Sequence, residues 1–82
     1  MRIRIVSDGR VFDGSPAQIV RQMQQIAFGK EQFTLGEYID WLVEQTARFE
    51  GITLDVAGET AADKANSLVA ELIRHGLALG IL

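Results

Sequence analysis

The sequence predicts a small α+β domain, in which an antiparallel sheet packs against three helices. Two short apolar runs flank an Asp-Gly pair at positions 8–9, as in a β-hairpin. Three longer segments repeat apolar residues at helical spacing, and each follows a helix-capping sequence. The expected sheet contains the N-terminal hairpin plus one or two further strands, and the expected order is β-β-α-α-β-α with an optional final β. The 82 residues form a single domain, 1–82.

The hairpin is predicted from Asp8-Gly9. Asp-Gly between two apolar runs favours a two-residue type I′ turn, in which both central residues need positive φ. In that register Ile5 lies opposite Phe12, and the two side chains share the face that packs in the core. A second Asp-Gly pair, at positions 13–14, ends the second strand and leads into a helix.

Each helix is predicted to begin at a Ser or Thr that is followed three positions later by Gln, Glu or Asp, which is the pattern of a capping box. Pro16 occupies the first helical position of the first helix, where its missing N–H costs nothing. The predicted cap pairs are Ser15 with Gln18, Thr34 with Glu37, and Thr60 with Asp63. The predicted ends are Gly29, Gly51 and Gly76, the last as a left-handed cap.

Two further segments have strand patterns. Apolar and polar residues alternate over 52–56, which predicts a half-buried strand that ends at Gly58. The tail, 77–82, is almost wholly apolar. Three roles remain open for it: it adds a strand to its own sheet, docks on the core, or meets the same tail of a second copy. We favour the first.

The composition indicates a globular chain without disulfides. Hydrophobic residues make up 48% of the chain and charged residues 23%, as in a folded domain. No cysteine is present, which excludes thiolate metal sites. No apolar run approaches the ~20 residues of a membrane helix, and no apolar segment of a signal peptide follows Arg2 and Arg4. We therefore expect an intracellular, cytoplasmic protein of bacterial origin.

The sequence lacks the patterns of a catalytic or cofactor site. The one histidine, His75, lies at a predicted helix end, where it suits the helix dipole better than general-base catalysis. No serine has a G-x-S-x-G context, no Asp-Gly pair has the spacing of a calcium loop, and the glycines form no phosphate-binding loop. We predict no catalytic residue, cofactor, metal or small-molecule substrate, and thus no enzyme.

Protein–protein interaction or oligomerisation is the class of function that remains, with a homodimer or a protein partner expected. Trp41 points away from the apolar stripe of its helix and Tyr38 lies at the stripe's edge, and aromatic residues of this kind are enriched at interfaces. Equally, another helix or the tail of the same chain could cover Trp41. Val6 and Val11 lie on the hairpin face that the helices leave free. The predicted contact residues are Tyr38, Trp41, Val6, Val11, Leu79, Ile81 and Leu82.

The alternative function is a nucleic-acid-associated regulator that uses the basic N-terminal hairpin. The net charge of −3 divides into +3 over residues 1–30 and −6 over residues 31–82. Such asymmetry can mark a nucleic-acid face, attraction between copies or a solvated surface, and dispersed charges favour the last. The sequence pI of about 4.9 also argues against nucleic acid. The predicted nucleic-acid contacts are Arg2, Arg4 and Arg10.

Overall fold

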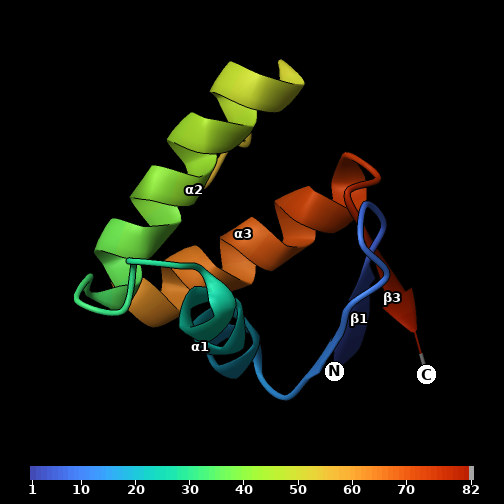
Figure 1. The fold of residues 1–82 in the computed structure, drawn as a ribbon, viewed down its shortest axis with the longest axis horizontal. Coiled ribbons are helices and arrows are strands. Elements are labelled where there is room, and N and C mark those ends of the chain that lie inside the picture. Colours follow the sequence, from blue (N-terminus) through green and yellow to red (C-terminus); the bar gives the residue numbers. More distant parts are fainter. Residues whose placement is uncertain (82) are drawn as a thin grey trace.

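The computed structural model describes residues 1–81 and confirms the α+β fold class (Figure 1). Three helices pack on a three-stranded antiparallel sheet. The elements are β1 (Arg2–Ile5), β2 (Val11–Asp13), α1 (Pro16–Ile26), α2 (Leu35–Glu50), α3 (Ala61–Arg74) and β3 (Ala78–Ile81).

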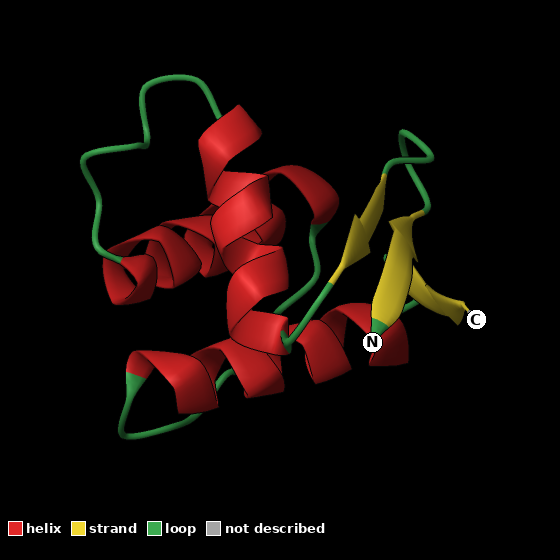
Figure 2. Cartoon of the chain, turned by 90° about the horizontal axis from the view of Figure 1, so that it is seen from below, coloured by secondary structure: helices red, strands yellow, loops and turns green. Residues whose placement is uncertain are grey.

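The sheet has the order β2-β1-β3, so the N-terminal strand is central and pairs with the C-terminal strand at one edge. Ile3, in the middle of β1, is fully buried and lies opposite Phe12 of β2 and Gly80 of β3. The helices gather on one side of the sheet, as Figure 2 shows, and the other face of the sheet points outward. The apolar tail therefore takes the first of its three roles and forms a strand of its own sheet.

The hairpin register differs from the predicted one by two residues. Phe12 lies opposite Ile3 instead of Ile5, and five residues, 6–10, join the strands. Gly9 alone has positive φ (75°), and Asp8 does not, so a type I′ turn cannot form. Instead, the Asp8 carboxylate accepts a hydrogen bond from the N–H of Arg10 (2.9 Å), and the Gly9 N–H bonds to the Ile5 carbonyl (2.8 Å).

The strand predicted over 52–56 requires correction. The segment keeps the predicted alternation, with Leu54 buried between exposed Thr53 and Asp55, but it pairs with no strand in residues 1–81. It runs beside α3, where side chains of that helix bind its backbone. An extended chain can thus satisfy its polar groups without a neighbouring strand.

The helix starts follow the sequence prediction. Capping boxes form at Ser15 with Gln18 and at Thr34 with Glu37, where each pair exchanges two hydrogen bonds of 2.8–3.2 Å. At Thr60 only half of the predicted box forms within residues 1–81: its hydroxyl accepts a bond from the backbone N–H of Asp63 (3.1 Å), but the Asp63 side chain does not bond back to the Thr60 N–H. α1 ends at Ile26, three residues before the predicted Gly29, whereas α2 ends at Glu50, directly before the predicted Gly51, which is left-handed.

The end of α3 is a Schellman motif. Gly76 has a φ of 74°, its N–H bonds to the carbonyl of Ile73 (3.0 Å), and the Leu77 N–H bonds to that of Leu72 (2.8 Å). Leu77 packs against the core immediately before β3 begins. The cap therefore turns the chain from the last helix into the edge of the sheet.

The hydrophobic core fills the space between the inner face of the sheet and the three helices. Every element contributes to it, and so does the 52–56 segment. Its buried members are Ile3, Phe12, Ile19, Val20, Leu35, Tyr38, Ile39, Leu54, Ala65, Leu68, Val69, Leu72 and Ala78.

Candidate functional site

The outer face of the sheet gathers predicted contact residues from both ends of the chain. Alternation along β1 turns the neighbours of buried Ile3 outward, and cross-strand partners share that face. Three apolar side chains here are well exposed: Val6 (54%), Val11 (50%) and Leu79 (45%). The two cross-strand rows of the outer face are Val11–Arg4–Leu79 and Asp13–Arg2–Ile81.

The free edge of β3 adjoins the outer face. β1 pairs with one side of β3, and no strand within residues 1–81 pairs with the other. The Val6 N–H bonds to the Leu77 carbonyl (3.0 Å), so alternation of the ladder directs the backbone groups of Ala78 and Gly80 away from β1. Ile81 is half-buried, and the predicted contact Leu82 lies outside the described residues.

The three arginines predicted for nucleic-acid contact divide between ion pairs and open surface. Arg2 contacts Asp13 through two nitrogens (3.1 and 3.2 Å), and Arg10 lies 3.7 Å from the carboxylate of Asp8. Arg4 forms no ion pair within residues 1–81 and stands between two apolar neighbours on the outer face. The hairpin therefore carries paired rather than concentrated positive charge.

Tyr38 and Trp41 lie together on α2, which packs on α1 and α3. Tyr38 is 3% exposed and belongs to the core, which corrects the prediction of a surface position. Trp41 is half-buried; its ring centroid lies 5.8 Å from that of Tyr38, and the ammonium of Lys30 lies 4.7 Å from a ring centroid of Trp41. The segment between α1 and α2 thus covers part of Trp41, whereas the sequence interpretation named another helix or the tail as the cover.

A pocket of about 340 Å³ was not foreseen from the sequence. It opens between the hairpin loop, one face of α2 and the C-terminal ends of α1 and α3, and its lining is mainly apolar. Tyr38 lines it, and burial raises the pKa of the Tyr38 hydroxyl. No local motif announces this pocket, because its lining comes from five separate parts of the chain.

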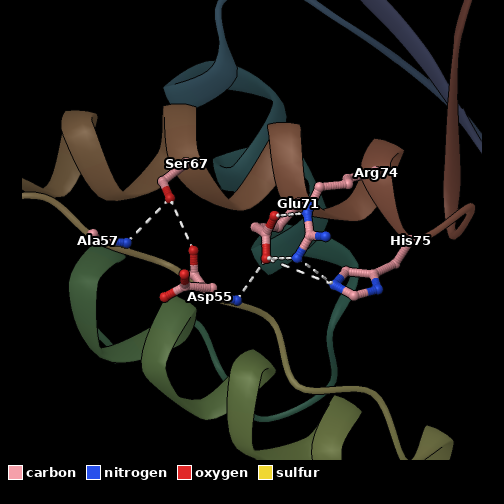
Figure 3. A network of polar contacts seen from close by, with 6 residues as sticks. All are labelled: Asp55, Ala57, Ser67, Glu71, Arg74 and His75. Carbon is pink, nitrogen blue, oxygen red and sulfur yellow. Dashed lines mark hydrogen bonds and ion pairs between the residues drawn. The ribbon is translucent and has the colours of Figure 1, made fainter.

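A cluster of polar contacts fastens the 52–56 segment to α3 (Figure 3). One carboxylate oxygen of Glu71 accepts the N–H of Asp55 (2.7 Å), and the other accepts Nε of Arg74 (2.6 Å). The hydroxyl of Ser67 accepts the N–H of Ala57 (3.1 Å). The hydrogen bonds from Arg74 and then from the Asp55 amide lower the pKa of Glu71 to about 2.

His75 belongs to the same cluster. Its Nε2 lies 3.6 Å from the Glu71 carboxylate and 3.1 Å from a guanidinium nitrogen of Arg74. Its side chain is 25% exposed and follows the last turn of α3. The cluster thus joins the backbone of the 52–56 segment to the C-terminal end of α3, and we assign it a structural role.

Within residues 1–81, no group of three or more His, Cys, Asp or Glu side chains is placed to hold a metal ion. None of the helices described is long and apolar enough to cross a membrane. Comparison of the chain with models of protein families, with curated proteins and with solved structures gave no match in any of the three.

Proposed function

We propose that the protein is a cytoplasmic interaction module without catalytic activity, and that it forms a homodimer by pairing the free edge of β3 with β3 of a second copy. The observation that carries the proposal is that free edge. Its position beside exposed apolar side chains of the outer face supports it further.

The free edge lacks the charged side chains and the proline that often protect a sheet edge from pairing. Natural edge strands are blunted by charged side chains, proline, bulges or very short length. β3 has the sequence ALGI, which contains no charge and no proline. The opposite edge, β2, has only three residues, ends at Asp13 and is followed closely by Pro16. Of the two edges, β3 is the one fitted for association.

A second copy is the partner that this edge fits best. In a two-fold dimer each β3 offers the same outward backbone groups to the other, so both edges are satisfied at once. Leu79 and Ile81 of both copies would then lie side by side on the outer faces, continuous with exposed Val11. Small domains gain stability from such association, since they bury little of their own surface.

Nucleic-acid regulation is the less supported function. Arg2 and Arg10 already have carboxylate partners, and the chain as a whole is acidic, with a net charge of −3. Proteins that bind nucleic acid usually present concentrated positive charge.

The mass of the protein in solution tests the proposal. Light scattering behind size exclusion, over a concentration series, should give twice the 9.0 kDa chain mass. Gly80→Pro should give 9.0 kDa, because proline removes an outward N–H of β3 and leaves the ladder to β1 intact.

Gly80→Ala is the matched control, since a Cβ at this position meets nothing within 4 Å and the N–H remains. It should stay dimeric. A monomeric wild-type protein at every concentration, or a Gly80→Pro variant that still dimerises, would contradict pairing through β3.

A further inference from the structure

The pocket described above runs along one face of α2, from Tyr38 to Glu50, and reaches the C-terminal ends of α1 and α3. Ile26 is the last residue of α1, Glu50 is the last residue of α2, and Gly76 follows α3 by two positions; all three line the pocket. The C-terminal end of a helix carries partial negative charge from its last carbonyl groups. The backbone therefore makes this pocket favourable for a cation.

The charged side chains on the pocket have the same sign. Its lining includes two charged residues, Asp8 and Glu50, and both are acids. Asp8 shares its carboxylate with Arg10 at 3.7 Å, whereas Glu50 forms no ion pair within residues 1–81. The lining thus holds one carboxylate without a counter-charge.

The lining also includes apolar side chains and three residues that carry a hydroxyl, Ser7, Tyr38 and Thr46. Phe12, Met23 and Leu42 are among the apolar side chains that line it. Tyr38 is 97% buried, yet its hydroxyl has no hydrogen-bond partner in residues 1–81. In the described part of the chain, every side-chain oxygen or nitrogen without a hydrogen-bond partner has some solvent contact, so the Tyr38 hydroxyl reaches solvent, and Tyr38 is among the residues that line the pocket.

We propose that the pocket binds a small organic cation, namely an aliphatic chain that ends in an ammonium group. The chain would fill the apolar interior, and the ammonium would lie at Glu50 and Asp8, near the helix ends. About 340 Å³ is within the usual range for small-ligand sites. An anion of the same length would be repelled by the carboxylates and the helix ends. No β3 residue lines the pocket, so this site is independent of dimerisation.

Titration of isotope-labelled protein with n-hexylammonium and, separately, with hexanoate tests the charge preference. The amide signals of Thr46 and Gly76, both in the lining, should shift with n-hexylammonium, while that of Gly58 in the loop before α3 should not. Affinity for the ammonium should exceed that for the carboxylate about tenfold, given two exposed charge interactions of modest strength. Equal affinities, no binding of the ammonium, or shifts away from the pocket would overturn the proposal.

Glu50→Gln and Glu59→Gln provide a charge-matched pair of variants. Both remove one exposed carboxylate, but only Glu50 lines the pocket. Glu50→Gln should weaken n-hexylammonium binding about threefold, while Glu59→Gln should leave it unchanged. If the two variants behave alike, the pocket does not select for positive charge. Both positions are at the surface, and the amide spectrum of each variant reports whether its fold is kept.

Discussion

The carboxylate of Glu71 joins two parts of the chain that the sheet does not connect. Its two oxygens bind the backbone of Asp55 and the guanidinium of Arg74, although Glu71 itself is only 8% exposed. A buried carboxylate is tolerated only when its oxygens are paired in this way. Glu71 therefore accepts a backbone hydrogen bond of the 52–56 segment that a neighbouring strand would otherwise accept.

This role predicts a specific loss of stability in acid. The pKa of Glu71 falls from its ordinary value of 4.5 to about 2 on folding, chiefly because Arg74 binds it. A carboxylate with a lowered pKa stabilises the fold fully above its unfolded pKa, and the contribution is lost as pH falls through the folded pKa. Between pH 4.5 and pH 2, Glu71→Gln should lose less stability than the wild type in urea unfolding.

Glu59→Gln serves as the control here too, because Glu59 is exposed and forms no ion pair within residues 1–81. It should keep the steep acid loss of the wild type. Parallel pH profiles for the wild type and Glu71→Gln would show that Glu71 does not carry the effect.

At the scale of elements, the N-caps of the three helices and the C-terminal cap of α3 depend on residues that are close together in the sequence. Each N-cap contact joins residues three apart, so nothing distant is needed to form it. The Schellman motif at Gly76 is equally local, since all its bonds lie within six residues. These features could therefore be predicted residue by residue.

Two glycine substitutions, one just after α3 and one within α2, should have opposite effects on stability. Gly76→Ala should destabilise by about 1 kcal/mol, because alanine disfavours the left-handed conformation although no atom blocks its Cβ. Gly36→Ala, within α2 and equally unobstructed, should stabilise by up to about 0.5 kcal/mol. Thermal unfolding followed by circular dichroism measures the stability of both variants. Stability changes of the same sign would mean that the backbone conformation of the glycine does not determine the effect.

Strand pairing was less predictable than the helix ends. Moving the hairpin register by two residues leaves Ile3, Ile5 and Phe12 on the same face, so the apolar pattern cannot distinguish the two registers. The observed register goes with a loop in which the Asp8 carboxylate accepts a hydrogen bond from the N–H of Arg10. Likewise, alternation over 52–56 reports one buried side of an extended chain, but not whether a strand or a helix lies beside it.

For the whole molecule, the candidate surfaces depend on which elements the fold brings together. Val11 and Leu79 were each predicted as contacts, but only the order β2-β1-β3 places them in one row with Arg4 between them. Trp41 was ambiguous because its cover comes from Lys30, in a segment without periodic pattern. The pocket was missed since one face of α2, the ends of α1 and α3 and a hairpin loop, all distant in sequence, form it together.

The pairing of Arg2 with Ile81 also has a kinetic consequence. The central ladder of the sheet must close nearly the whole chain into a loop, and such distant contacts slow folding. A circular permutant that joins the ends by a short linker and opens between exposed Glu31 and Gln32 would make the three strands consecutive. It should fold faster at similar stability in stopped-flow experiments. An unchanged rate would mean that the sheet forms only after the folding barrier.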